Sequence, residues 1–284
     1  MKQRIIHFFL LATALFVMTG CAGNLYNVPK ETFEKKVRVL GVAPVMLDAD
    51  SDIRHPEKDA LVGILGELNR SNTRELVGQL KKSGAFFVVQ ALPDDPDQLF
   101  STLFFRRERR DDAGVIYNKH FLKGPELKDI IEKNKVDALF VVVMSGLTKH
   151  GRRYSSNLIN YVESDYNNLV MTAQILDAEG TVLWEYPNFR KRSPSFPTFL
   201  ALQYPDFDEA EANADDKVLV HFKTIDGIKR ALSKKTRSAA LSNAEVSALY
   251  AEAFEEMVSL LKPETDPFAF FKGKKKDPAA QPAQ

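Results

Sequence analysis

The 284-residue chain is short of cysteine and of net charge. Its single cysteine, Cys21, excludes an internal disulfide and a cysteine-rich metal site. Lys and Arg number 39 against 38 Asp and Glu, whereas a dedicated nucleic-acid-binding protein is usually strongly basic. The sequence also lacks a Gly-rich loop that would cradle a phosphate, and after Val17 it lacks an apolar run long enough to span a bilayer.

Residues 1–20 differ in composition from the rest of the chain. Lys2 and Arg4 precede an apolar stretch, Ile5–Val17, and small residues then lead to Cys21. This layout predicts a secretory signal peptide, and the apolar stretch is short for a transmembrane helix. Because Lys2 and Arg4 are the only charged residues of the signal, the remaining chain has 37 basic and 38 acidic residues, formally −1.

The tetrad Met18-Thr19-Gly20-Cys21 resembles the lipobox of bacterial lipoproteins. The resemblance implies cleavage after Gly20, a diacylglyceryl group on the Cys21 thiol, and a fatty acid such as palmitate on the new amino terminus. Several acyl chains anchor a protein stably, at about 0.8 kcal/mol per buried methylene. Ala22 follows the cysteine, which resembles the sorting pattern for the outer membrane in enterobacterial lipoproteins. The alternative is an ordinary signal peptide that happens to contain a cysteine.

Behind the signal, the composition divides the chain into three parts. Residues 21–36 are mostly polar and predict a lipidated tether, whose ends would lie about 20 Å apart as a flexible coil. Residues 37–262 predict one periplasmic α/β domain, with an irregular insert at 187–217. Residues 263–284 are rich in Pro, Lys and Ala and predict a disordered tail.

The domain begins with the pattern of a βαβ unit. Val37–Met46 is continuous, apolar and β-branched, which predicts a buried strand. A capping-box pattern opens a predicted helix over 72–83, and an apolar stripe over 60–68 indicates that a longer or broken helix precedes it. Gly84 ends the helix, and Phe86–Ala91 predicts the second strand.

The middle of the domain contains the most apolar segment after the signal, Val136–Leu147, which we interpret as the central strand. Two helices are predicted before it, over 97–107 and 125–133. After it, 168–176 and 181–186 predict a hairpin, whose turn contains Gly180 to supply a positive φ.

The carboxyl-terminal part predicts one long amphipathic helix, Ser242–Leu261, opened by a capping box of Ser242 and Glu245. Val218–Leu232 is ambiguous between strand and helix. The predicted fold class is therefore α/β (mixed α+β): a single mixed sheet with helices packed on it, a βαβ start, a later β-hairpin and a long final helix.

Four segments in order resemble a periplasmic α/β architecture: VRVLGVAPV, NTRELVGQLKKSGAFFVV, VDALFVVVMSG and ILDAEGTVLWE. This architecture occurs in the amino-terminal domain of the Tol-system translocation protein, in curli-secretion and polysaccharide-export lipoproteins, and in lipoprotein activators of penicillin-binding proteins. The resemblance covers about half of the mature chain, and the insert after Trp184 departs from it. It implies assembly, export or activation through protein contacts, and no catalytic residues carry over.

The insert at 187–217 has four prolines and five aromatic residues. A long irregular segment in a compact domain is usually functional or disordered, and this aromatic content disfavours disorder. Two interpretations stay open: a lid packed on the sheet, or a contact surface for a partner. The five candidate contact residues are Phe189, Phe196, Phe199, Tyr204 and Phe207.

Several polar residues have patterns that fall short of a metal or catalytic site. The spacing of Asp48, Asp50, Asp52 and Asp59 resembles a calcium loop, but Ile53 stands where that loop needs Gly, so a solvated acidic loop is favoured. The histidines show no i, i+4 pair and do not predict a zinc site; they include His55, His120, His150 and His221. Ser145 in VMSGL lacks the first Gly of a nucleophile elbow. We therefore expect no catalytic residue, metal or cofactor.

Two basic clusters have open interpretations. Arg106, Arg107, Arg109 and Arg110 are interrupted by Glu108, which favours a solvated helix end over contact with anionic lipid or glycan. In the tail, three Phe residues precede four Lys residues. A disordered tail is the favoured interpretation, and docking on a partner or a membrane is the alternative. These tail residues are Phe268, Phe270, Phe271, Lys272, Lys274, Lys275 and Lys276.

Together these features predict an outer-membrane lipoprotein that faces the periplasm and acts as a non-catalytic component of an envelope assembly or export system. Its partners would be the membrane, through its lipid, and envelope proteins, with a homo-oligomer also open. One alternative is a subunit of an oligomeric secretion channel, which needs an amphipathic hairpin; only 153–170 is a candidate. A third is an envelope hydrolase, which needs a pocket lined by at least two of Asp48, Asp50, His55, Asp137 and His150.

Replacing Cys21 with Ser tests the anchor. We expect the variant to lose its lipid and to leave the membrane fraction for the soluble fraction, because the thiol is the attachment point. The measurement is fractionation of cells that lipidate other proteins normally, followed by detection of the variant. Continued sedimentation of the Cys21→Ser protein with membranes would refute the anchor.

Overall fold

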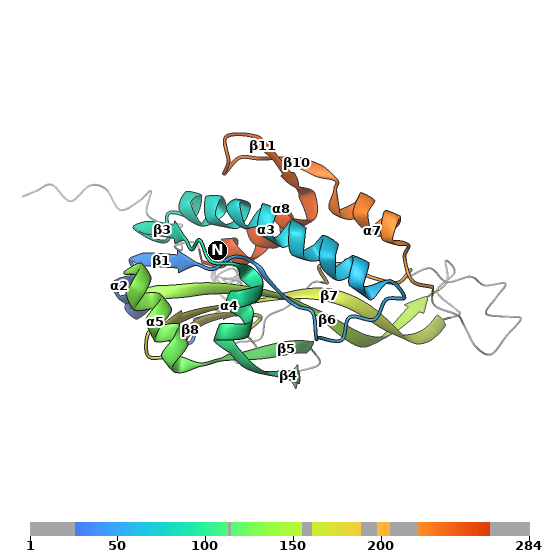
Figure 1. Cartoon of the computed structure of the whole chain (residues 1–284), viewed down its shortest axis with the longest axis horizontal. Helices are drawn as coiled ribbons and strands as arrows, with labels where there is room; N and C mark the ends of the chain where they lie inside the picture. Colours follow the sequence, from blue (N-terminus) through green and yellow to red (C-terminus); the bar gives the residue numbers. More distant parts are fainter. Residues whose placement is uncertain (1–25, 113–114, 155–160, 189–197, 205–220, 262–284) are drawn as a thin grey trace, which may run out of the picture.

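The computed structural model describes residues 26–112, 115–154, 161–188, 198–204 and 221–261. These residues form a seven-stranded mixed sheet with helices on its faces, which confirms the predicted α/β class. Figure 1 shows α3 and the segment from α7 to β11 above the sheet, and the β4–β5 hairpin below it. The signal, Cys21 and the tail from 263 lie outside the described residues.

The sheet is organised around β6, and its strand order is β3-β1-β6-β7-β8. β1 pairs in parallel with both β3 and β6, whereas β7 pairs antiparallel with β6 and β8. Two short strands complete the sheet, β2 beside β6 and β9 beside β7. The strands are β1 Val39–Val42, β2 Met46–Asp48, β3 Val88–Ala91, β6 Ala138–Tyr154, β7 Tyr161–Asp177, β8 Val182–Tyr186 and β9 Leu200–Ala201.

The βαβ prediction is confirmed, and its helix is one element, α3, which spans Lys58–Ser83. The expected capping box at Asn72 is wrong, because the apolar stripe continues through it and the Asn72 amide donates to Leu68 O within the helix. Gly84 ends α3 with a φ of 70°, as predicted. The predicted first strand is divided into β1 and β2 by Ala43–Val45.

The charged run FFRRERRDD corrects a prediction. The helix expected over 97–107 is α4, Pro96–Leu103, which Asp95 caps by accepting hydrogen bonds from two amide groups. From Phe104 the chain is extended, because β4 (Phe104–Asp112) pairs antiparallel with β5 (Val115–Leu122). The helix predicted over 125–133 follows as α5, Gly124–Asn134.

The predicted central strand is confirmed, and it is longer than expected. β6 runs beyond Leu147 to Tyr154 and pairs with β7 along its whole length. The extension was not predicted because residues 148–154 are polar and lack the apolar signal of the buried part. The β7–β8 hairpin is also confirmed, with Gly180 at a φ of 76° in its turn.

The predicted carboxyl-terminal helix is correct only in its second half. Ser242 and Asn243 have φ values of 51° and 65°, which a right-handed helix excludes. They form the turn between β10 (Lys235–Ser238) and β11 (Ala244–Ser247), so α8 begins only at Ala248 and ends at Ser259. The ambiguous segment before them contains the helix α7, Ile225–Leu232.

The tether expected over 21–36 is also too long. Tyr26 forms an antiparallel bridge with Trp184, and α2 (Lys30–Lys36) follows at once. Phe33 is 1% exposed and contacts the Tyr26 ring at 4.8 Å between centroids. These two aromatic residues bury apolar surface against the sheet, so residues 26–36 belong to the folded body.

The core has two parts, one on each face of β6. Phe140, Val142 and Met144 face the part that includes α3 and α8, while Leu139, Val141 and Val143 face α4 and α5. All six of these side chains are at most 2% exposed. Successive residues of a strand point to opposite faces, so a continuously apolar segment serves a strand buried on both sides.

Gly146 sets a tight contact that can be tested. A Cβ there would lie 2.5 Å from backbone atoms of Asp52 and Ile53, and backbone cannot move aside as a side chain can. We expect Gly146→Ala to lower the free energy of unfolding by about 2 kcal/mol, the usual cost of overpacking.

The matched control is Gly63→Ala on the exposed side of α3, where nothing lies within 4 Å of the added Cβ. It should raise the free energy of unfolding by up to about 1 kcal/mol, because Ala favours a helix over Gly. Urea unfolding of both variants gives the comparison. Equal effects would show that the 2.5 Å approach at Gly146 is not a constraint.

Candidate functional site

A groove lies where the parallel strands β1 and β3 end. Its volume is about 1070 Å³. Its sides are α3, the β3–α4 loop and the β10–β11 turn. Ligands of open α/β sheets bind outside the carboxyl ends of the strands, and this groove occupies that place. Its charged lining residues are Arg70, Arg74, Lys81, Lys82, Asp94 and Asp95.

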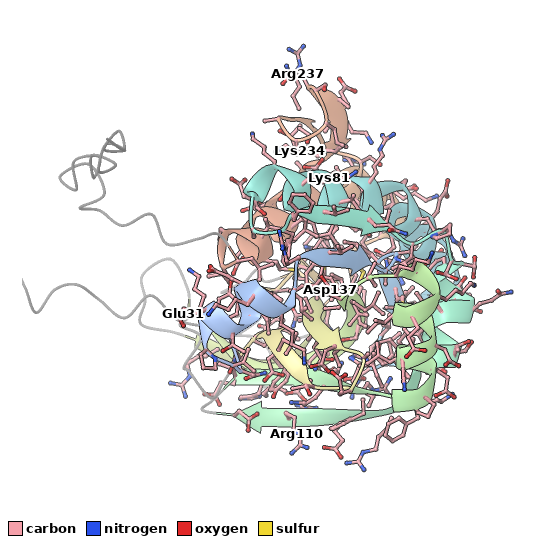
Figure 2. The ribbon with its side chains drawn as sticks, turned by 90° about the vertical axis from the view of Figure 1, so that its left-hand side faces the viewer. Glu31, Lys81, Arg110, Asp137, Lys234 and Arg237 are labelled. Atoms are coloured by element: carbon pink, nitrogen blue, oxygen red, sulfur yellow. The ribbon has the colours of Figure 1, made fainter. Side chains whose placement is uncertain are left out.

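The cations of this groove fall into two kinds. Arg70 is neutralised, because its Nη2 lies 2.5 Å from Asp97 and 3.6 Å from Asp95. Arg74, Lys81 and Lys82 are exposed, and no carboxylate of the described residues pairs with them. Figure 2 shows Lys81 on the same side of the molecule as Lys234 and Arg237. The groove therefore presents positive charge that no carboxylate of the described part of the chain neutralises.

The β10–β11 turn forms one wall of the groove by packing closely on α3. A Cβ on Gly78 would lie 2.9 Å from the Leu241 side chain and 3.3 Å from Ala240 O, so the helix needs a small residue at this point. A second pocket of about 290 Å³ lies on the other side of the same turn, lined by Arg237 and Glu255 among others.

The described residues that line the groove offer no free hydroxyl or thiol group as a nucleophile. The one hydroxyl that lines it, on Thr73, donates to Asn69 O and accepts from Val45 N. No histidine, serine or cysteine lines it. Its remaining lining is mostly apolar, from residues such as Val77, Leu92 and Leu241. Apolar walls with a few unpaired cations suit the binding of an anionic group on a larger partner.

A second polar cluster is buried below the sheet. Asp48, at the end of β2 and 2% exposed, lies 2.6 Å from Arg107 and 2.9 Å from His120. Burial alone raises the pKa of the Asp48 carboxyl, but the hydrogen bonds and positive charge of His120 and Arg107 outweigh it and hold the pKa below its usual value. The carboxylate is thus kept charged by two groups of the β4–β5 hairpin.

This cluster attaches the hairpin to the sheet. Asn118 of β5 donates to Ser145 Oγ and to Gly146 O, both at 2.9 Å. Ser145 is thus bonded to an amide, while His120 is bonded to Asp48, so the described residues contain no Ser–His pair here. The His120 ring also contacts Phe104, with centroids 5.6 Å apart. These residues hold two parts of the fold together.

The remaining candidate acids and histidines are dispersed. Asp52 accepts from Thr148 N and pairs with Arg54, and Asp59 lies in the first turn of α3, so the calcium pattern does not assemble. His55 bonds to Lys223 O, and exposed His150 lies 3.2 Å from Asp165. No group of three His, Cys, Asp or Glu within the described residues is placed to hold a metal ion.

Of three further candidates, Asp137 has a structural role, whereas Asp50 and His221 are exposed and accept hydrogen bonds through their backbone carbonyls. Asp137 accepts hydrogen bonds from the amides of Arg38 and Val39, at 2.9 and 2.7 Å, and so fixes the start of β1. Asp50 is exposed, and its carbonyl accepts from Arg107. His221 is exposed and uses its carbonyl to accept from Tyr204 N.

The arginine cluster lies on a strand, so the expected solvated helix end is wrong. Arg107 pairs with Asp48, and Arg109 donates to Thr148 O at 3.0 Å. Arg106 and Arg110 both pair with Glu108, and Arg106 also stacks over Phe121. All four guanidinium groups have partners within the domain, which disfavours the lipid or glycan contact.

The insert aromatics are only partly described. Phe199 is half-buried and packs edge-on against Tyr250, with ring centroids 4.9 Å apart. Tyr204 is 44% exposed. The other three candidate contacts, Phe189, Phe196 and Phe207, lie outside the described residues. Of the two described residues, Phe199 thus packs on α8 and Tyr204 faces solvent.

The groove cations were missed at the sequence level. Arg74, Lys81 and Lys82 lie on a correctly predicted helix, where the ordinary interpretation is a solvated face. The groove wall opposite them is the β10–β11 turn, whose last two residues, Ser242 and Asn243, were predicted as the start of a helix. The signal that was available is the sequence SAALSN (residues 238–243), because Ser and Asn favour turns.

No known protein family matches this chain, and no curated protein is detectably similar to it in sequence. Among solved structures, it is similar to a Helicobacter pylori protein described as a homologue of a neuraminyllactose-binding hemagglutinin. The identity is 10%, the match covers 79% of this chain and 84% of that one, and the TM-score is 0.34. At this level of similarity we transfer neither ligand nor activity. None of the described helices is long and apolar enough to cross a membrane.

Asp48→Asn tests the buried cluster. We expect the free energy of unfolding at about pH 7 to fall by about 3 kcal/mol, because Arg107 and His120 lose the charge they share. The folded-state pKa of Asp48 is depressed, so its contribution is present above the unfolded-state pKa and is lost as the pH falls through the folded-state pKa. The difference in the free energy of unfolding between the wild type and the variant, measured with urea, should therefore be smaller at about pH 3 than at about pH 7.

Asp50→Asn is the matched control, since Asp50 is exposed and its carboxylate has no partner among the described residues. It should change the free energy of unfolding by less than about 0.5 kcal/mol at either pH. A pH-independent deficit in the Asp48 variant would contradict the linkage.

Proposed function

We propose that this chain is a lipid-anchored protein of the periplasmic face of the outer membrane, and that it binds an envelope partner without catalysing a reaction. The observation that carries the proposal is the groove beside α3, with its apolar walls and the unpaired cations Arg74, Lys81 and Lys82. The lipobox tetrad ending at Cys21 supports the location. The resemblance to export and activator lipoproteins supports a role through protein contacts.

The groove is suited to capture because its charge is not compensated. Unpaired like charges repel each other and lower the stability of the protein slightly. An anionic partner would relieve this repulsion, and no ion pair within the protein has to break for it to bind. Complementary charge also speeds encounter and excludes wrongly charged partners. The apolar lining then provides the contact that holds the partner once it is seated.

The channel alternative has less support. The candidate segment 153–170 lies mostly in β7, which is paired with β6 as part of the domain sheet. In the projecting part of this hairpin, ion pairs cover one face, including Arg152–Glu163. The other face pairs Lys149 with Tyr166 and Gly151 with Ser164. Neither described face is apolar, whereas a channel wall needs an apolar face toward lipid.

The hydrolase alternative required a pocket lined by at least two of five candidate residues. Neither the groove nor the pocket on the other side of the β10–β11 turn is lined by Asp48, Asp50, His55, Asp137 or His150. Asp48 and Asp137 are instead engaged in hydrogen bonds that hold strands together. Binding is therefore the better-supported function.

A photoreactive residue at Ala239, which is exposed and lines the groove, tests the proposal in intact cells. We expect it to crosslink a distinct envelope protein, and a photoreactive residue at exposed Asp129 of α5 to yield none. Reversing the charge of all three cations (Arg74→Glu, Lys81→Glu, Lys82→Glu) should reduce the crosslink about tenfold or more, equivalent to about 1.4 kcal/mol.

The charge-reversed protein must unfold at the same urea concentration as the wild type, so that a lost crosslink reports binding. Equal crosslinking from both positions, or no effect of the reversal, would refute the groove as the binding site. Turnover of a cell-wall substrate by the purified chain would refute the absence of catalysis.

A further inference from the structure

The sheet has an open edge next to the groove. β3 is the terminal strand of the sheet order, and among the described residues its one strand partner is β1. Ala91 and Leu92, at the end of β3, line the groove itself. The edge and the groove are therefore continuous, and a segment seated in one is within reach of the other.

The outward backbone groups of β3 can be identified from its bonds to β1. Val88 N donates to Arg38 O at 3.0 Å, and Leu92 N donates to Val42 O at 2.9 Å. Backbone groups alternate in direction along a strand, so the N–H and C=O of Val89 and Ala91 point to the open side. They offer hydrogen bonds to an added strand.

β3 is short, at four residues, but its edge lacks the charged residues and the proline by which proteins also protect open strands. Ala85–Leu92 contains no charged residue and no proline. Phe87 is 78% exposed and Val88 is 40% exposed, although both are large apolar residues. Native edges are usually blocked by charge, proline or a covering element, so an unprotected apolar edge marks a site of strand pairing.

Positive charge surrounds the edge without lying on it. Arg38 stacks over Phe87, with its guanidinium carbon 5.4 Å from the ring centroid. Lys81 and Lys82 of α3 precede β3 in the chain and line the groove beside it. Pairing of β3 with β3 of a second copy would bring these cations together, and like charges at short range oppose association. The surroundings favour a partner that carries carboxylates.

We propose that the partner contributes an extended segment with acidic side chains, which adds to β3 as a further strand and places its carboxylates against Lys81, Lys82 and Arg74. The inference rests on the proposed binding function and specifies the chemistry and the mode of that binding. Main-chain hydrogen bonds to Val89 and Ala91 provide affinity in this mode, and side-chain contacts provide specificity.

The test uses the purified full chain in detergent and a short fluorescent peptide that alternates Glu and Val. We expect saturable binding by anisotropy, and no binding of the matched peptide with Lys in place of Glu. Hydrogen exchange with the wild-type chain should slow in a peptide fragment covering β3 when the acidic peptide is bound, because the amides of Val89 and Ala91 become bonded.

Two variants separate the strand pairing from the charge. Ala91→Pro removes an outward N–H but no bond to β1, and proline is tolerated on that side of an edge strand. It should weaken binding about tenfold or more. Lys81→Glu with Lys82→Glu should do the same, whereas the matched reversal of Lys234 and Lys235, which do not line the groove, should have less than about a threefold effect.

Equal binding of both peptides, an unaffected Ala91→Pro variant, or unchanged exchange at β3 would each overturn the strand-addition mode. A dimer of the wild-type chain that Ala91→Pro dissociates would overturn it in favour of self-pairing. If the Ala239 crosslink needs the groove cations while β3 shows none of these effects, the proposed function stands and only this inference fails.

Discussion

The whole domain depends on one strand that is buried on both sides. In β6, consecutive residues from Leu139 to Met144 point alternately into two cores, and each is almost completely removed from water. Every other layer is placed by this arrangement: α3 and α8 cover one face, and α4 and α5 cover the other. Burial of apolar area on two faces makes the register of β6 costly to change, since a shift by one residue exchanges the two cores.

Charged side chains are paired around Asp48 in the interior of this domain, whereas three on the exposed side of α3 have no such partner among the described residues. The carboxylate of Asp48 is desolvated, and it receives both a guanidinium and an imidazole. A buried carboxylate without such partners would cost several kcal/mol, so removing either partner would destabilise the fold. Along α3, by contrast, Arg74, Lys81 and Lys82 remain hydrated and need no partner for the fold. That freedom is what makes them available for recognition.

The fold class, the central strand and the βαβ unit could be predicted from sequence, because they depend on apolar periodicity over many residues. The errors occurred where that signal is absent. β4 and the outer part of β6 are strands with polar residues, stabilised by pairing with a neighbour rather than by their own composition. At Ser242 and Asn243, helical periodicity extended across a turn, and two residues of positive φ decided the structure. The candidate groove could not be predicted, because it is formed by segments more than 150 residues apart, such as Arg74 and Leu241.

The docking of Tyr26 and Phe33 on the sheet has a consequence for how far the domain can move. Only five peptide steps separate Cys21 from Tyr26, and a chain of that length spans about 17 Å when fully stretched. With a lipid on Cys21, this short linker would keep the folded domain within a thin layer next to the bilayer. A binding partner must enter that layer, and one confined to the same surface would meet the groove at a much higher local concentration than one diffusing freely through the compartment.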